Sequence, residues 1–310
     1  MTRIRSWWSR LGRWGRTTVI SLALILLLII GALFFRLPEM PHVELAAEEI
    51  FSIAGFAITN TMLAALLSIV VVGVVCFAAT RKMKIVPKGL QNIVEALLEM
   101  LINFVEDTAG KEHGRKFFPV IATIFIFVIF NAWLALIPGF MTIGFWHSGE
   151  EGQFLVPLFR SANTDINFPL ALALISFVFV EYWGFRTQGF FRYMSKFISV
   201  GGLFRGIGQV LKGKIKSGLG TFTMGIIDVY TGVIELISEL VRIISLTFRL
   251  FGNMLAGELL ILVMIFLIPW VVAIPFYGLE LFLGFVQALI FGGLTLVFLV
   301  IAVAPREEHL

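Results

Sequence analysis

Arg249 lies in the middle of the most apolar part of the chain, between residues 245–248 and residues 250–253. An arginine side chain keeps its proton in proteins, so it cannot become neutral as a lysine can. A charged side chain at the centre of a membrane costs about 2.5 kcal/mol or more and is a candidate functional site by default. The sequence therefore predicts that Arg249 serves as a fixed positive charge at membrane depth.

Further polar side chains follow the helical face that carries Arg249. Residues three, four and seven apart share one face of a helix. The resulting polar stripe consists of Glu235, Ser238, Arg242, Ser245, Arg249 and Asn253. Glu239 precedes Arg242 by three residues, a spacing at which the two side chains can form an ion pair.

Two carboxylates and an amide lie on the C-terminal side of this stripe. Glu258 follows Arg249 by nine residues and falls on the opposite helical face, so it is no easy partner for Arg249. In the last apolar segment Glu280 and Gln287 are seven residues apart and share a face. Antiparallel packing of the two segments would bring Gln287 toward Arg249 and Glu280 toward Glu258.

The polar residues form two clusters with Arg249 between them. The inner cluster comprises Asp228, Glu235, Ser238, Glu239 and Arg242. The outer cluster comprises Glu258 and Glu280, with Asp165 and Asn167 as further candidates. Chains of carboxylates inside a membrane mark proton or ion routes. Because a fixed cation repels a proton, we expect two half-routes whose ion is carried past Arg249 by a carboxylate on another chain.

At several of these positions a purely structural role is an alternative to a role in an ion route. Glu235 and Arg242 could form a structural ion pair, and Glu239 fits a structural partner better than a route residue. Asn253 and Gln287 could simply hydrogen-bond between helices. Two other classes of protein also stay open, a secondary transporter whose Arg249 binds an anionic substrate and a membrane scaffold. The absence of an internal sequence repeat counts against the transporter.

The composition is that of a polytopic membrane protein. Of the 310 residues 59% are hydrophobic and 14% are charged, whereas soluble domains carry about 25% charged residues. The net charge of +4 comes largely from loops and does not indicate nucleic-acid binding. Cys76 is the one cysteine, and the four histidines are scattered without an HExxH pattern. We therefore expect neither a metal site nor a cofactor.

Six apolar segments are expected to cross the membrane as helices: residues 19–35, 58–79, 117–137, 168–185, 221–267 and 276–303. Five arginines and no acidic residue precede the first segment, which places the N-terminus in the cytoplasm. A retained anchor is favoured over a cleaved signal peptide. Residues 90–107 have the periodicity of an amphipathic helix. In the basic loop 186–220, the P-loop-like spacing from Gly208 to Lys214 is read as a chance match.

The segment 221–267 has two interpretations. As one helix its 47 residues would be about 70 Å long, against about 30 Å for the hydrocarbon core. It is therefore either one steeply tilted helix or two spans with a turn. One crossing gives six spans and a cytoplasmic C-terminus, whereas two crossings place the C-terminus outside.

Residues 247–258, TFRLFGNMLAGE, resemble the signature of subunit a in the membrane sector of rotary F-type ATP synthases. The run QALIF at residues 287–291 is similar to the family's QAFIF segment. Weaker matches lie at residues 118–119, 131, 136–138 and 163–167, so the resemblance covers about residues 45–308. Two departures are the Arg-rich first segment and the long basic loop.

The resemblance implies an all-α stator subunit that packs against a ring of c subunits, with b-type peripheral-stalk subunits, the remaining ATP synthase subunits and membrane lipid as further partners. Arg249 would be the family's essential arginine, facing the ring carboxylate. The proton path would use Glu235 and Ser238 on the inner side, Glu258 and Glu280 on the outer side, and Asn253 and Gln287 at the ring, with Asp165, Asn167, Arg242 and Ser245 as further candidates. Glu280 stands where some relatives have histidine, and two glutamates there would share a proton or bind a cation.

The same resemblance favours the single crossing. It implies six crossing helices, including a long, steeply tilted helical hairpin at about residues 221–303, in a bacterial cell membrane with both termini cytoplasmic. We expect residues 1–45 to form an extra anchor and residues 46–310 one membrane domain. The subunit would conduct protons and would not itself form ATP.

Overall fold

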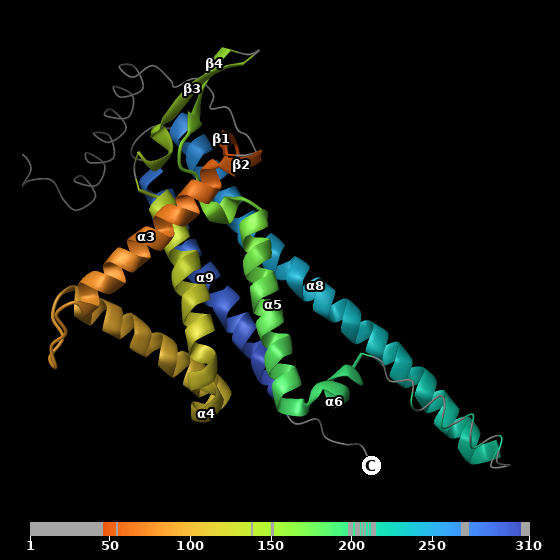
Figure 1. Ribbon diagram of the computed structural model, residues 1–310. Coiled ribbons are helices and arrows are strands. Elements are labelled where there is room, and N and C mark those ends of the chain that lie inside the picture. Colours follow the sequence, from red (N-terminus) through yellow and green to blue (C-terminus); the bar gives the residue numbers. More distant parts are fainter. Residues whose placement is uncertain are drawn as a thin grey trace, which may run out of the picture. The chain divides into compact units, whose positions relative to one another are not determined.

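The computed structural model describes residues 46–53, 55–137, 139–149, 152–197, 201, 205, 207, 209, 211, 215–267 and 273–304. The predicted anchor at residues 1–45, the C-terminal tail and the glycines and lysine of the P-loop-like match lie outside these residues. The described chain is mostly helical (Figure 1). Its helices are α3 (Asn60–Thr80), α4 (Leu90–Ala135), α5 (Asn167–Gln188), α6 (Phe190–Met194), α8 (Ile215–Leu267) and α9 (Ala273–Val303).

Among the described residues, five helices are long and apolar enough to cross a membrane, namely α3, α4, α5, α8 and α9. They coincide with five of the six predicted segments, and the sixth, residues 19–35, lies outside the described residues. The predicted class, a helical polytopic membrane protein, is confirmed.

Helix α4 joins two predicted elements, the amphipathic segment 90–107 and the third span. Gly110 separates them with a φ of 74°, a left-handed conformation that glycine adopts without steric cost. Figure 1 shows the change of direction in α4. Leu101 and Val105 of the amphipathic half are buried, whereas Ile93 is exposed. The ion pair between Arg115 and Glu106, at 3.0 Å, bridges the bend.

Helix α8 is continuous over 53 residues. At 1.5 Å per residue it is about 80 Å long, more than twice the thickness of the hydrocarbon core. The alternative of two spans with a turn between residues 221 and 267 is therefore wrong. A helix of this length crosses the membrane once, either tilted or extending beyond it.

Two short hairpins were not predicted. Strands β1 (Glu49–Ile53) and β2 (Phe56–Thr59) pair antiparallel before α3, and β3 (Gly144–Gly149) pairs with β4 (Gly152–Pro157) between α4 and α5. Short 3-10 turns at Phe140–Thr142 and Ala162–Thr164 flank the second hairpin. The hairpins connect the helices and leave the helical class unchanged.

The chain divides into two compact units, one of which holds residues 46–255 and 282–310 and the other residues 256–281. In the larger unit one core cluster joins four helices, α4, α5, α8 and α9. Its members include Phe125, Val128, Leu172, Ala173, Leu246, Leu250, Ala288 and Phe291. Ser176 of α5 also hydrogen-bonds Thr295 of α9 at 2.8 Å inside the protein.

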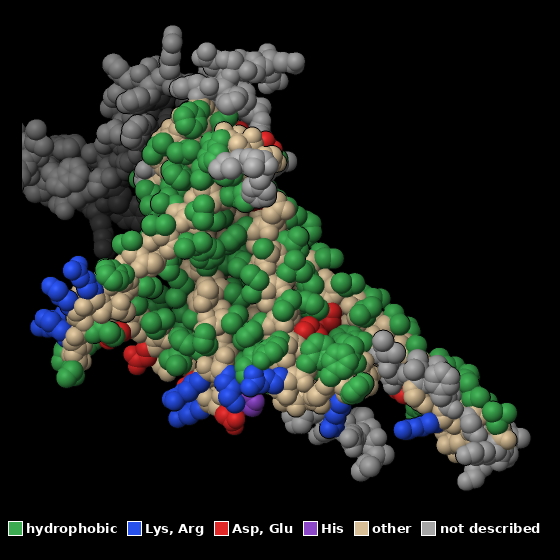
Figure 2. All heavy atoms as spheres, in the orientation of Figure 1, with side chains coloured by type: hydrophobic (Ala, Val, Ile, Leu, Met, Phe, Trp, Pro, Cys, Tyr) green, Lys and Arg blue, Asp and Glu red, His purple; other side chains and the backbone are tan. Residues whose placement is uncertain are grey.

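Basic side chains of the larger unit gather near one end of its helices (Figure 2). They come from the connection between α3 and α4, the bend in α4, and the segment around α6. The exposed members include Arg81, Lys82, Lys84, Lys88, Lys111, Arg115, Lys116, Arg186 and Arg192. This clustering is the pattern that the positive-inside rule associates with a cytoplasmic face.

Candidate functional site

Arg249 lies on α8 and is half-buried. Its Nη2 donates a hydrogen bond of 3.3 Å to Oγ of Ser245, one turn earlier on the same helix. Arg249 forms no ion pair with any residue that the structure describes. Its neighbours Leu246 and Leu250 are buried in the core, so the helix is held firmly where it carries the charge.

The polar neighbours expected around Arg249 differ in their exposure. Gln287 of α9 is 6% exposed, and the next residue, Ala288, belongs to the same core cluster as Leu250. Gln287 therefore lies next to the core cluster, and its predicted approach to Arg249 stays a prediction. Asn253 is exposed on α8.

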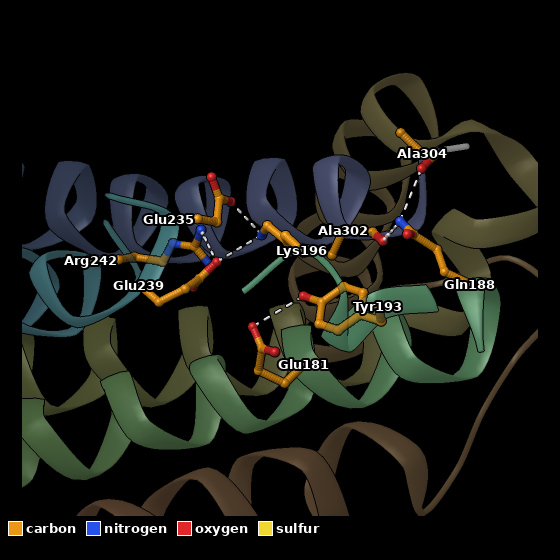
Figure 3. A network of polar contacts seen from close by, with 9 residues as sticks. All are labelled: Glu181, Gln188, Tyr193, Lys196, Glu235, Glu239, Arg242, Ala302 and Ala304. Atoms are coloured by element: carbon orange, nitrogen blue, oxygen red, sulfur yellow. Dashed lines mark hydrogen bonds and ion pairs between the residues drawn. The ribbon is translucent and has the colours of Figure 1, made fainter. Parts of the chain in front are cut away.

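The inner cluster is an ion-pair network. Arg242 pairs with Glu239 through two contacts, Nη1 to Oε2 at 2.6 Å and Nη2 to Oε1 at 3.0 Å. The Arg242 guanidinium also lies 3.8 Å from the centre of the Phe298 ring. Nζ of Lys196 lies 2.5 Å from Oε1 of Glu235 and 3.2 Å from Oε1 of Glu239 (Figure 3). The predicted pair of Glu239 and Arg242 is confirmed.

A second pair of residues extends this network to α5. The Tyr193 hydroxyl donates a hydrogen bond of 3.2 Å to Oε1 of Glu181, and both side chains are buried (Figure 3). Burial, followed by the negative charge of Glu181, raises the pKa of the Tyr193 phenol above its ordinary value. The phenol therefore keeps the proton that it donates to Glu181.

Sequence reasoning missed three members of this arrangement, Glu181, Tyr193 and Lys196. Glu181 carried a usable signal, because it is the one acidic residue in the predicted span 168–185. Lys196 carried none, because it is one of several cations in the basic loop. Two predicted members, Asp228 and Ser238, are exposed and make no side-chain hydrogen bond with the described part of the chain.

Glu258 and Glu280 belong to the unit of residues 256–281. Glu280 is 7% exposed, and its carboxyl group lies directly against Gly257, the residue before Glu258. A Cβ atom at Gly257 would overlap that carboxyl group. The absence of a side chain at residue 257 therefore makes room for Glu280, and the predicted approach of Glu280 to the Glu258 region is present.

Asp165 and Asn167 lie together at the start of α5. Oδ1 of Asp165 accepts hydrogen bonds of 3.0 Å from the backbone N–H and from Nδ2 of Asn167. Oδ2 of Asp165 accepts a 2.8 Å hydrogen bond from the Thr61 hydroxyl. Asp165 thus ties the beginning of α5 to the beginning of α3. Over the described ranges, no three His, Cys, Asp or Glu side chains are grouped to hold a metal ion.

Comparisons with known proteins agree with this architecture. The family model described as ATP synthase A chain matches residues 61–300. ATP synthase subunit a of Helicobacter pylori (strain Shi470) is 33% identical over 266 residues, which cover 84% of this chain and 99% of the relative. ATP synthase subunit a of Campylobacter jejuni (serotype O:23/36, strain 81-176) is 35% identical over 237 residues, or 76% of this chain and 86% of the relative. The chain therefore belongs to the ATP synthase A chain family, the a subunits of F-type ATP synthases.

Proposed function

We propose that this chain is the proton-translocating stator subunit of its ATP synthase, with two offset half-channels separated by Arg249. The proposal rests on the surroundings of the Arg249 side chain. It sits on an apolar helix, its side-chain hydrogen bond within the described chain goes to the neutral Ser245, and no described carboxylate pairs with it. A charge held at such a cost, with no counter-ion among the described residues, suits a partner that arrives from another chain.

The partner that fits is a carboxylate on the ring of c subunits. When this carboxylate is ionised, Arg249 attracts it, and when it is protonated it can leave Arg249 and turn toward lipid. Asn253 is exposed one turn beyond Arg249 and would contact the ring beside it. Gln287 would support the interface from α9. Arg249 would also repel protons and so prevent them from passing directly between the two half-channels.

The two half-channels are supported by the separate polar groups. Glu258 and Glu280, near each other at Gly257, would deliver protons from the outer side. Glu235 and Ser238 would release them on the inner side, with Arg242 and Ser245 nearby. The clustered basic side chains support a cytoplasmic assignment for the inner side. Each proton that moves across 100 mV supplies about 2.3 kcal/mol for rotation of the ring.

This function requires the rest of the complex. The subunit would be non-catalytic, held by b-type peripheral-stalk subunits in the bacterial inner membrane, with both termini cytoplasmic. ATP formation would take place on other subunits. The rival role, a transporter that uses Arg249 to bind an anion, predicts solute uptake by the chain alone.

The test uses complete ATP synthase reconstituted into vesicles. Replacement of Arg249 by alanine should abolish ATP-driven proton pumping, whereas replacement of the exposed Arg186 by alanine should leave pumping intact. Retained pumping in the Arg249→Ala complex would overturn the proposal. Vesicles that contain only the purified subunit should take up no solute, and uptake would favour the transporter.

A further inference from the structure

The segment that contains α6 packs against both α5 and α8. On one side, the Tyr193 ring lies against Gly184 of α5, where a Cβ atom would overlap the ring. On the other side, the Phe197 carbonyl lies against Gly232 of α8, where a Cβ atom would overlap that oxygen. Each contact is so close that the position on the neighbouring helix, α5 or α8, requires glycine. Residues 190–197 therefore form a clamp that is held at both faces.

The clamp places one cation beside the inner carboxylates. Lys196 precedes Phe197, and Gly232 precedes Glu235 by three residues, so contact at Gly232 brings Lys196 to the face of α8 that carries Glu235. The distance from Nζ to Glu235 is 2.5 Å and to Glu239 is 3.2 Å (Figure 3). The side chain of Lys196 is 19% exposed and that of Glu235 is 36% exposed.

The two carboxylates depend on Lys196 to different degrees. Glu239 is 5% exposed at its side chain and already has Arg242 as a bidentate partner. Glu235 forms its ion pair in the described part of the chain with Lys196. Loss of Lys196 would therefore leave Glu239 paired and Glu235 without its cation.

We propose that Lys196 is a positioning residue for Glu235, whose carboxylate it holds in place through an ion pair at the inner end of the proton path. This inference rests on the proposed function, because it assumes that Glu235 exchanges protons with the inner side. A charge-assisted contact between two side chains restricts the geometry of both. Lys196 would thus keep the Glu235 carboxylate at the place where it exchanges protons.

Other titratable or charged groups lie around Glu235 on the neighbouring elements. A variant that tests Lys196 must leave the partners of these groups in place. Glu239 and Arg242 of α8 compensate each other. Glu181 of α5 is engaged by Tyr193. Lys196 is the cation whose removal changes the field at Glu235 without breaking either of these two pairs.

The experiment uses complete ATP synthase in vesicles, with Lys196→Gln and Lys196→Arg variants. Lys116→Gln is the matched control, because Lys116 pairs with the exposed Glu112 on the surface of α4. ATP supplied outside the vesicles activates complexes whose inner side faces outward. The amount of this chain in each purified complex is measured first, and the rate of ATP-driven proton pumping is then recorded per assembled complex.

Without the lysine, the Glu235 carboxylate should no longer be held in place. The pumping rate of the assembled Lys196→Gln complex should therefore fall several-fold, Lys196→Arg should restore it, and Lys116→Gln should match the unmodified complex. A Gly232→Ala variant, which displaces the clamp and removes no charge, should lower the rate in the same way.

An unchanged pumping rate in an assembled Lys196→Gln complex would overturn the positioning role, and so would a Lys196→Arg complex that pumps no faster than Lys196→Gln. So would failure of both Lys196→Gln and Gly232→Ala to assemble, because the clamp would then be a structural attachment only. The Arg249→Ala complex, measured in parallel, separates the two proposals. Retained pumping there means that the proposed function has failed, whereas an unchanged pumping rate in Lys196→Gln alone means that only the role of Lys196 has failed.

Discussion

Arg242 and Glu239 are joined by two short contacts, of 2.6 Å and 3.0 Å, one turn apart on α8. Arg249 lies seven residues after Arg242 on the same helical face and pairs with none of the carboxylates that the structure describes. Two arginines in similar positions thus have different electrostatic surroundings. The first is neutralised within the chain, whereas no carboxylate in the described part of the chain neutralises the second.

The pair of Arg242 and Glu239 should contribute to the stability of the assembled subunit. Arg242→Ala removes both contacts and the cation–π contact with Phe298, and leaves Glu239 with Lys196 alone. Breaking a buried pair by removing one partner costs about 3 kcal/mol or more. We expect faster thermal inactivation of the purified complex, and a smaller loss for the double variant Arg242→Met/Glu239→Leu.

The control for this pair is Lys116→Ala, which breaks an exposed ion pair on α4 and should not change the inactivation rate. A double variant that is less stable than Arg242→Ala would contradict the assignment of a mutually neutralising pair.

Gly257 should be required for full activity of the complex, because the Glu280 side chain occupies the space where a Cβ atom of residue 257 would lie. Gly257→Ala places a methyl group where the Glu280 carboxyl group lies, so the carboxyl group must move. ATP synthesis driven by an imposed proton gradient should fall several-fold. Gly278→Ala is the matched control, because a Cβ atom there meets nothing within 4 Å.

The shorter side chain in Gly257→Ala/Glu280→Asp should recover part of the lost activity, since it withdraws the carboxyl group by one methylene. Equal rates of ATP synthesis for Gly257→Ala and Gly278→Ala would rule out this role of Gly257.

Asp165 should act as a helix cap more than as a proton carrier. Its carboxylate accepts two hydrogen bonds from Asn167 and one from Thr61. Asp165→Asn keeps an acceptor oxygen and cannot exchange protons, so it should retain proton pumping. Asp165→Ala removes the cap and should lower stability by about 1 kcal/mol, measured as faster thermal inactivation. Loss of pumping in Asp165→Asn at normal assembly would place Asp165 in the proton path instead.

The features that could be predicted from the sequence are those set by local pattern. The apolar segments predicted five described helices, and the spacing of three residues predicted the pair of Glu239 and Arg242. Arg249 was identified because a permanent charge in an apolar helix is costly wherever that helix packs. The predicted roles of Arg249, Asn253, Gln287 and the carboxylates stay predictions.

The features that escaped prediction depend on contacts distant in sequence. Lys196 reaches Glu235 only because the Phe197 carbonyl packs on Gly232, and no local pattern specifies that contact. Tyr193 and Glu181 meet because Gly184 admits the tyrosine ring. The continuity of α8 was also ambiguous, since periodicity alone does not distinguish one long helix from two spans with a short turn.

The central claim is that Arg249 separates the two half-channels, and passive proton flow tests it most directly. Vesicles that contain the membrane sector with Arg249→Ala, stripped of the ATP-forming subunits, are given a potassium diffusion potential, and proton entry is followed with an internal pH indicator. Free protons should then cross without rotation of the ring. The account predicts proton flow that persists after the ring is cross-linked to this chain, whereas cross-linking should stop flow through the unmodified sector. Arrest of flow in cross-linked Arg249→Ala vesicles would contradict the account.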